Sequence, residues 1–328
     1  MKRRSFIKNA SIFAGSLATT KLISSTATAQ NLKELNFGII STESQANQKP
    51  IWEPFVAAMS RELGMPVRAF YATQYAGVIE AMRFGQVQLA WYGGKSYIEA
   101  AKRAEAEVFA QTVADDGSKG YYSHLIMNKN HPDLAKAQSM GGDKYVLENA
   151  SRLQFAFNDP NSTSGFLVPS YYVFAQNGVN PKKVFKRLIF AGNHEATALA
   201  IANNQVDVAT NNNESLSRLE TTNPKARANI ETIWTSTLIP SDPIAWRKDL
   251  PEAIKAKLRS FFYSYKDPNV LGALGWSGFD PATDDMWNPI RELNIGKQIL
   301  EVQSNDNLSQ TEKDKQIAEL NRQLEALD

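Results

Sequence analysis

The chain has 328 residues, 43% of them hydrophobic, and a formal net charge of +2 at pH 7. It contains no cysteine, which excludes disulfide bonds, thiolate metal ligands, a cysteine nucleophile and a lipid-modified cysteine anchor. Residues 1–29 contain five Lys and Arg residues and no acid, so the rest of the chain carries a net charge of −3. A mildly acidic chain gives no compositional support for nucleic-acid binding.

The N-terminus has the order of an export signal. A basic segment with the pair Arg3-Arg4 is followed by an apolar stretch at 10–18 and by small residues that end at Ala29. This order predicts a signal peptide cleaved after Ala29, and the arginine pair indicates the twin-arginine pathway. A basic, disordered arm would explain the charges but not their order. The apolar stretch is shorter than the roughly 20 residues of a spanning helix, so we expect a periplasmic protein without a membrane anchor.

Short β-rich runs alternate with helical patterns after the signal. The apolar spacing predicts strands at 35–40, 67–71 and 87–92, with helices at 50–63 and 75–84 between them. A second set follows, with strands at 121–128, 153–157, 184–190 and 206–209 and helices at 166–176 and 195–203. Strand-helix alternation of this pitch predicts an α/β fold with doubly wound, mainly parallel sheets.

Two polar or proline-containing breaks, at 115–120 and 239–243, separate the two sets. We therefore expect lobe 1 to comprise 30–118 and 240–302, and lobe 2 to comprise 119–239, inserted into lobe 1. The helices predicted at 251–265 and 287–302 have no parallel strands of their own. Ligands of open α/β sheets bind at the C-terminal ends of the strands, which predicts a ligand cleft between the lobes.

A separate helix is predicted within residues 303–328. Its apolar residues Ile317, Leu320, Leu324 and Leu327 follow a spacing of three, four and three, which is a coiled-coil seam over barely two heptads. Such a stripe either packs on its own domain or forms a homodimer, and the sequence leaves both interpretations open.

Three consecutive hydroxyl residues, Ser162, Thr163 and Ser164, follow the strand at 153–157 and precede a helical run. Their hydroxyl groups, the free backbone N–H groups of the first helical turn and the helix dipole suit a tetrahedral oxyanion. A single such residue would be an ordinary N-cap. Three together before Gly165 favour an anion site.

Five segments of the chain are similar to the phosphonate-binding subunits of bacterial ABC importers. They are NFGIISTES at 36–44, AWYG at 90–93, FAQTV at 109–113, DPNSTSGFLVP at 159–169 and VDVATNN at 206–212. The resemblance covers the whole chain after the signal, in order. It implies the two-lobed periplasmic-binding-protein fold of type II, a membrane permease as partner and, most closely, 2-aminoethylphosphonate as the ligand.

The same resemblance implies eight ligand-binding residues. They are a phosphonate cradle of Ser162, Thr163 and Ser164, the flanking Tyr75 and Tyr121, the phosphonate contact His194, and the acids Glu214 and Asp242. A carboxylate repels an anionic ligand unless a cation lies between them, so two acids opposite the cradle suit a zwitterion with an ammonium group. Taken singly, Glu214 would be an acid at a helix start that interacts favourably with the helix dipole, and Asp242 would be a turn residue.

The remaining candidates have structural interpretations of comparable weight. His194 alone would be a surface or capped histidine, and His124 and His131 are expected to be structural. Tyr75, Tyr121, Trp91 and Tyr92 can also be interpreted as core aromatics. We slightly prefer this interpretation for Trp91 and Tyr92, although the end of their predicted strand would place one of them at the cleft.

Two other functions compete with this one. A receptor for phosphite, phosphate or a simple alkylphosphonate would share the fold, but two acids would hinder binding of a ligand without an ammonium. An enzyme on the same fold is disfavoured, because the sequence shows no cysteine nucleophile, no legible metal cluster and no Gly-x-Ser-x-Gly motif. We expect no cofactor and no metal.

Overall fold

The computed structural model describes residues 32–327, and the fold is given for that part of the chain. The predicted signal peptide and its twin-arginine pair lie outside the described residues. No helix between residues 32 and 327 has the length and apolar character needed to cross a membrane.

Lobe 1 is built on a six-stranded sheet in the order β13-β4-β12-β3-β1-β2. β1 pairs in parallel with β2 and β3, whereas β12 is antiparallel to β3 and β4, and β13 is antiparallel to β4. The strands are β1 (Leu35–Ile39), β2 (Val67–Tyr71), β3 (Leu89–Trp91), β4 (Ala106–Ala114), β12 (Pro243–Arg247) and β13 (Trp276–Pro281). β1 to β4 thus run in one direction, and the two strands from the end of the chain run against them.

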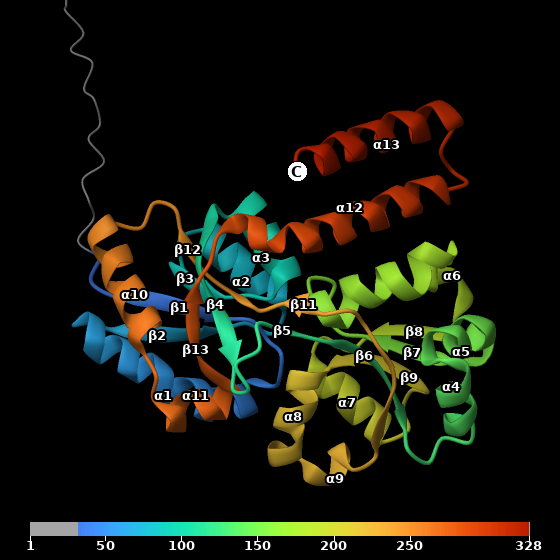
Figure 1. Cartoon of the computed structure of the whole chain (residues 1–328), viewed down its shortest axis with the longest axis horizontal. Coiled ribbons are helices and arrows are strands. Elements are labelled where there is room, and N and C mark those ends of the chain that lie inside the picture. Colours follow the sequence, from blue (N-terminus) through green and yellow to red (C-terminus); the bar gives the residue numbers. More distant parts are fainter. Residues whose placement is uncertain (1–31, 328) are drawn as a thin grey trace, which may run out of the picture. The chain divides into compact units, whose positions relative to one another are not determined.

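The helices of lobe 1 pack on both faces of this sheet (Figure 1). They are α1 (Gln45–Leu63), α2 (Tyr75–Arg83), α3 (Gly94–Arg103), α10 (Glu252–Ser264) and α11 (Pro268–Leu274). Aromatic side chains dominate the core, with Trp52 5.0 Å from Trp91 and 5.4 Å from Trp276 between ring centroids. The apolar face predicted at 50–63 is buried. The helix begins earlier than predicted, at Gln45, and this start was not predicted because the first turn is polar and gives no apolar signal.

Lobe 2 is built on a five-stranded sheet in the order β10-β6-β9-β7-β8. β7 pairs in parallel with β8 and β9, and β6 is antiparallel to β9 and β10. The strands are β6 (Ser123–Asn128), β7 (Gln154–Phe157), β8 (Arg187–Phe190), β9 (Val208–Asn212) and β10 (Ile230–Thr235). Four of these five strands run in one direction, so both sheets are mixed but mainly parallel in direction, as the α/β prediction required.

The helices of lobe 2 include several short segments. They are α4 (Leu134–Met140), α5 (Gly142–Asn149), α6 (Pro181–Val184), α7 (His194–Ala202), α8 (Asn213–Thr222) and α9 (Pro224–Arg227). A further helical segment runs from Thr163 to Asn177 and contains two π-helical stretches, Thr163–Leu167 and Ser170–Phe174. The helix predicted at 166–176 therefore starts three residues earlier, at the hydroxyl residues themselves.

The chain passes between the sheets at two places, where β5 (Gly120–Tyr121) and β11 (Ile239–Pro240) form a small antiparallel pair. The single strand predicted at 121–128 is wrong, because Tyr121 belongs to β5 and β6 starts at Ser123. The exposed Tyr122 lies between them, where the chain leaves the small pair and enters the sheet of lobe 2.

Two long helices end the chain, α12 (Asn288–Gln303) and α13 (Gln310–Glu325). α12 starts beside Trp287, which packs on Tyr97 of lobe 1, and its Lys297 Nζ lies 5.4 Å from the ring centre of Phe166 in lobe 2. α13 folds back along α12, and the Asn288 side chain donates a 2.9 Å hydrogen bond to the carbonyl of Leu327 (Figure 1).

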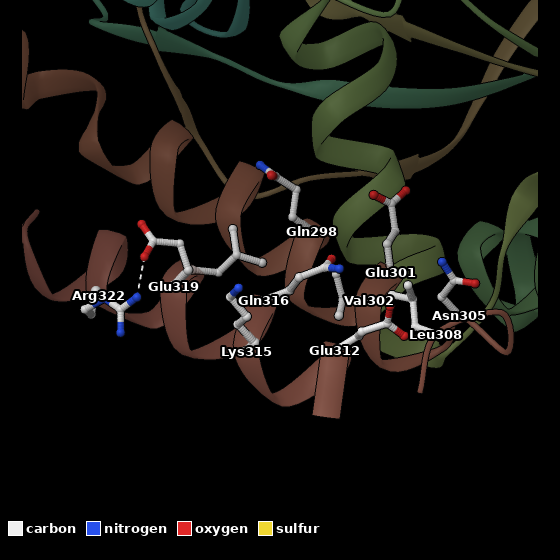
Figure 2. Close-up of a pocket in the computed structure, with 11 residues that line it drawn as sticks. Gln298, Glu301, Val302, Asn305, Leu308, Glu312, Lys315, Gln316, Glu319 and Arg322 are labelled. Carbon is white, nitrogen blue, oxygen red and sulfur yellow. Dashed lines mark hydrogen bonds and ion pairs between the residues drawn. The ribbon is translucent and has the colours of Figure 1, made fainter. Parts of the chain in front are cut away.

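The predicted seam of α13 faces α12 only in part. Leu320 is buried, whereas Ile317, Leu324 and Leu327 are half-buried. A groove of about 660 Å³ lies between the two helices, and Figure 2 shows its mixed lining of apolar side chains such as Val302 and Leu308 and charged ones such as Lys315. The stripe thus packs on its own chain, with part of its apolar surface still accessible.

Candidate ligand-binding site

Helix starts from both lobes gather at the junction between the two sheets. In each case a strand leads into a helix, as in β2 to α2, β3 to α3, β7 to Thr163, β8 to α7 and β9 to α8. The first turn of a helix has backbone N–H groups without intrahelical partners and a partial positive charge. The junction is therefore suited to an anion before any side chain is considered.

Direct hydrogen bonds join the two lobes at this junction. The Lys95 backbone N–H donates to Thr163 Oγ1 over 2.9 Å, and the Tyr75 backbone N–H donates to Asp159 Oδ2 over 3.2 Å. The His194 backbone N–H donates to the carbonyl of Thr42 over 3.0 Å. The lobes are thus closed upon one another, and the candidate residues are enclosed between them.

The three cradle hydroxyls are all buried, and each accepts a hydrogen bond from the protein. Ser162 Oγ caps the helix by accepting from the Gly165 N–H over 2.9 Å, Thr163 Oγ1 accepts from Lys95, and Ser164 Oγ accepts from Asn212 Nδ2 over 3.1 Å. A hydroxyl that accepts still has its own proton to donate. The N-cap interpretation of Ser162 and the anion-donor interpretation of the cradle are therefore compatible.

Gly165 is required by the close approach of the backbone to Asn158. A Cβ at Gly165 would lie 2.2 Å from Asn158 Nδ2, a distance that no side chain tolerates. The Gly165 carbonyl also accepts from the Asn158 N–H over 3.1 Å and from Thr210 Oγ1 over 2.7 Å. These contacts fix the helix start against β9 and the end of β7.

His194 is the first residue of α7 and is buried beneath the cradle. Its Nδ1 is hydrogen-bonded to Asn158 Nδ2 at 2.6 Å, and its Nε2 lies 3.4 Å from Asn212 Nδ2. Burial lowers the pKa of His194 to about 3, so the imidazole is neutral at pH 7. It can exchange a hydrogen bond with a ligand, but it adds no positive charge.

Tyr75 and Tyr121 approach from different elements. Tyr75 is the first residue of α2 in lobe 1, and Tyr121 lies in β5 at the chain crossing. Burial raises the pKa of both hydroxyls, and nearby carboxylates raise it further, Asp159 for Tyr75 and Asp242 for Tyr121. Both phenols are therefore neutral, with protons available for donation.

Asp242 lies between β11 and β12, with 7% of its surface exposed. Within residues 32–327 its Oδ1 is buried without a hydrogen-bond partner. Burial raises the pKa of Asp242, and the Glu214 carboxylate raises it further. A Cβ at Gly93 would lie 3.2 Å from Thr163 Oγ1 and 3.7 Å from Asp242 Oδ1, so the cradle and Asp242 flank the same point at the start of α3.

Glu214 is in the first turn of α8, half-buried on the side of lobe 2. Burial raises its pKa, whereas Arg218 opposes that shift. Glu214 and Asp242 both influence Tyr121, which places the two acids around that phenol. Buried carboxylates without a cation are costly, so this end of the site suits a positively charged group.

The structure brings the eight predicted residues together through these contacts, and their role in binding stays a prediction. It also separates Trp91 from Tyr92. Tyr92 is fully buried in lobe 1, with its hydroxyl 3.5 Å from Met82 Sδ. Trp91 lies close enough to Asp242 to affect the pKa of that carboxyl, and its Nε1 has no partner among the described residues.

Three residues that support the site were not predicted from the sequence. Asn158 and Asn212 hold His194 from two sides, and Asp159 joins the cradle loop to α2. Asn212 stands where an N-cap of α8 is expected, and that pattern could have identified it. Nothing in the sequence places Asn158 against a histidine 36 residues away.

Two α/β lobes closed over a buried polar site at the C-terminal ends of their strands define a two-lobed ligand receptor. The family model described as "ABC transporter, phosphonate, periplasmic substrate-binding protein" matches residues 37–287, and the chain belongs to this family. Its members are substrate-binding components of transporters and not enzymes, and they act in the periplasm.

Individual relatives agree with this assignment. The phosphonates-binding periplasmic protein of Escherichia coli K12 is 47% identical over 320 residues, covering 96% of this chain and 92% of that protein. A binding protein component of an ABC phosphonate transporter from Pseudomonas aeruginosa has a TM-score of 0.85 and 48% identity, covering 90% of this chain and 96% of that one. PhnD1 from Prochlorococcus marinus, solved with methylphosphonate, has a TM-score of 0.71 and 25% identity, covering 80% and 97%.

Proposed function

We propose that the protein captures 2-aminoethylphosphonate in the periplasm and delivers it to the permease of an ABC importer. Asp242 carries this proposal, because its buried Oδ1 has no hydrogen-bond partner within residues 32–327 and lies beside the hydroxyl cradle and near a second acid, Glu214. A zwitterion with a phosphonate at one end and an ammonium at the other satisfies both ends of the site.

The phosphonate end is supported by neutral donors at helix starts. Ser162, Thr163 and Ser164 supply hydroxyl protons at the first turn of their helix, and Tyr75 and Tyr121 supply phenol protons. Hydrogen bonds from preorganised neutral groups and a helix N-terminus stabilise a dianion without a Lys or Arg side chain.

The ammonium end is supported by charge balance. Burial raises the pKa of both carboxyls, and the Glu214 carboxylate raises the pKa of Asp242 further; a cation between the two acids removes this cost. An ammonium group also donates three hydrogen bonds, of which Asp242 Oδ1 can accept one.

We propose that capture is a hinge closure of lobe 1 (30–118 and 240–302) against lobe 2 (119–239). The small pair of β5 and β11 lies where both chain crossings occur, so it is the hinge in this proposal. Tyr75 belongs to lobe 1 and the cradle to lobe 2, so a ligand that touches both favours the closed form. The closed form is the one recognised by the permease.

Export by a twin-arginine signal peptide, cleaved after Ala29, belongs to the same proposal and is supported by the order of residues 1–29. For α13 the open alternative is a homodimer. It is supported by the half-buried Ile317, Leu324 and Leu327 and by the groove beside α12 (Figure 2). Sedimentation of the protein with and without residues 309–328 tests it, since a dimer through α13 becomes a monomer on truncation.

A receptor for phosphite, phosphate or a simple alkylphosphonate is the second candidate, favoured by the methylphosphonate in the Prochlorococcus marinus relative. Isothermal titration calorimetry of the protein purified from the periplasm separates the two candidates. We expect 2-aminoethylphosphonate to bind at least about a hundredfold more tightly than methylphosphonate, since one desolvated charge pair is worth several kcal/mol. Equal affinities, or tighter binding of phosphate or phosphite, would contradict the proposal.

A further inference from the structure

An ion pair joins the lobes next to the binding site. Arg218 Nε in α8 of lobe 2 lies 2.9 Å from Glu43 Oε1, in the loop between β1 and α1 of lobe 1. The side chains are only 14% and 13% exposed, so water screens their attraction little. Thr42 Oγ1 donates a 2.5 Å hydrogen bond to Glu43 Oε2, and Arg218 Nη2 donates a 3.1 Å bond to Ser215 Oγ. Because its partners belong to different lobes, this pair requires closure.

Arg218 also has an acidic neighbour on its own helix. Glu214 precedes it by four residues in α8, so both side chains lie on one face, in the order that favours an ion pair on a helix. Each influences the other, since Arg218 lowers the pKa of Glu214 and Glu214 raises that of Arg218. Among the described residues, however, the ion pair of Arg218 within 4.0 Å is with Glu43. Glu214 forms no ion pair within 4.0 Å in the part of the chain that the structure describes.

Arg218 and Glu43 are closely packed, with little space for water beside their ion pair. The cavity lined by Glu43, His194 and Arg218 measures about 10 Å³, which is at most one water molecule. Two carboxylates thus lie near the guanidinium of Arg218, Glu214 on its own helix and Glu43 on the other lobe, and the position of the lobes determines whether Glu43 is within reach.

We infer that Arg218 exchanges its acidic partner on closure: it pairs with Glu214 when the lobes are apart, and Glu43 takes it when they meet. Closure thereby frees Glu214 for the ammonium of the ligand, so this inference rests on the proposed function. A closed site that is empty, or that holds a ligand without a cation, contains an uncompensated carboxylate, which is unfavourable. Arg218 is thus a positioning residue that ties closure to the presence of a cation, and it selects zwitterions.

Glu43→Gln tests the exchange. Without Glu43, Arg218 stays with Glu214 in the closed form, and the ammonium loses its carboxylate. We expect affinity for 2-aminoethylphosphonate to fall about tenfold more than affinity for methylphosphonate, as expected for loss of one close charge pair. Calorimetry with both ligands gives this ratio directly.

Glu195→Gln is the matched control in the same interface. Glu195 Oε2 accepts from the Ser44 N–H over 2.7 Å and Oε1 accepts from Asn47 Nδ2 over 2.6 Å, so it joins the same loop and the first turn of α1 to lobe 2 through neutral donors. Weakening this contact disfavours closure for every ligand. Both affinities should fall by the same factor, with the ratio unchanged.

The double variant Glu43→Gln with Arg218→Gln supplies the decisive comparison. With the competitor removed, Glu214 is again free, and the ligand ratio should return toward that of the wild type even if both affinities are lower. The exchange would be overturned if Glu43→Gln reduced affinity for the two ligands by the same factor. It would also be overturned if the double variant kept the ratio of the two affinities found in Glu43→Gln.

A ligand-free measurement separates this inference from the proposed function. In the unliganded wild-type protein, the Nε–H resonance of Arg218 should shift on Glu214→Gln, because the two side chains pair when the lobes are apart. No shift would contradict the exchange. Wild-type protein that binds neither phosphonate would contradict the proposed function instead.

Discussion

The hydroxyl cradle and the acid pair lie side by side in the binding site, but they differ in what the chain provides for them. Each hydroxyl of Ser162, Thr163 and Ser164 has a hydrogen-bond partner from the protein. Asp242 Oδ1 has none within the described residues, and its carboxyl is buried next to Glu214. The cradle is therefore complete without a ligand, whereas the acid pair is complete only with one. Selectivity among phosphonates should reside at the incomplete end.

The largest expected effect comes from removing charge at the acid pair. Asp242→Asn should weaken the binding of 2-aminoethylphosphonate by at least about a hundredfold, because truncating one partner of a buried charge pair costs about 2–5 kcal/mol. The unliganded protein should instead become more stable by about 1 kcal/mol, because a buried, unpaired charge is removed. Calorimetry and denaturant unfolding measure the two changes, and a variant that loses both stability and affinity would contradict the contrast.

The next effect distinguishes two glycines on either side of the cradle. Gly165→Ala places a Cβ 2.2 Å from Asn158 Nδ2 and should cost about 2–3 kcal/mol of unfolding free energy through overpacking. Gly93→Ala leaves 3.2 Å to Thr163 Oγ1 and should cost less than about 1 kcal/mol.

Ligand affinity separates the same two variants. Gly93→Ala narrows the space between the cradle and Asp242, so it should weaken binding more than its small effect on stability suggests. Unfolding in urea and calorimetry on both proteins test this, and equal stability of the two variants would show that the cradle is not rigid.

The pH dependence should have opposite signs for folding and for binding. The folded pKa of Asp242 is raised above its ordinary value of 3.8 by burial and by Glu214, with Tyr121 and Arg218 opposing. A carboxyl group whose pKa is higher in the folded than in the unfolded protein adds to the free energy of unfolding at pH values below its unfolded pKa. This contribution is lost as the pH rises through the folded pKa. The unliganded protein should therefore become more stable as the pH falls through the folded pKa of Asp242 toward its ordinary value.

Over the same range, affinity for the zwitterion should fall, by up to about tenfold per pH unit for each proton displaced. Calorimetry in two buffers with different ionisation enthalpies would detect proton release on binding. Affinity that is independent of pH across this window would mean that Asp242 is already ionised before the ligand arrives.

The smallest effect is expected far from both regions. Ser309 is the N-cap of α13 in a capping box, in which its Oγ accepts from the Glu312 N–H over 3.4 Å and its own N–H donates to Glu312 Oε2 over 2.9 Å. Ser309→Ala should cost about 1 kcal/mol of helix stability and leave affinity unchanged. A change in affinity, measured beside the wild type, would show that the C-terminal hairpin influences the site.

The sequence predicted the strand-helix alternation well where apolar periodicity was strong, and poorly where it was not. α3 contains Lys, Ser, Glu and Arg in ten residues and gave no clear apolar stripe. β12 begins at Pro243, at the end of the segment interpreted as a break. A proline is tolerated there because it is the first residue of the strand. The helix at Thr163 was placed three residues late, because hydroxyl side chains carry no periodic signal.

The candidate site was named from the family resemblance, and charge complementarity explained why acids belong in it. The interlobe partners could not be predicted in this way. Glu43 and Arg218 are 175 residues apart, and their contact depends on how two lobes meet. No local sequence pattern indicates how the lobes meet. The contact of Asn158 with His194 could not be predicted from a local pattern either.

The course of α12 has a practical consequence. Trp287, at its start, donates through Nε1 to the carbonyl of Ser241 over 3.2 Å, one residue before Asp242. Further along, Lys297 lies over Phe166, two residues beyond Ser164 of the cradle. α12 and the Trp287 that precedes it thus contact residues next to both ends of the site, one in each lobe. Because Trp287 and Ser241 both belong to lobe 1, a hinge motion between the lobes must separate Lys297 from Phe166, so the distance between these two side chains is a direct reporter of capture.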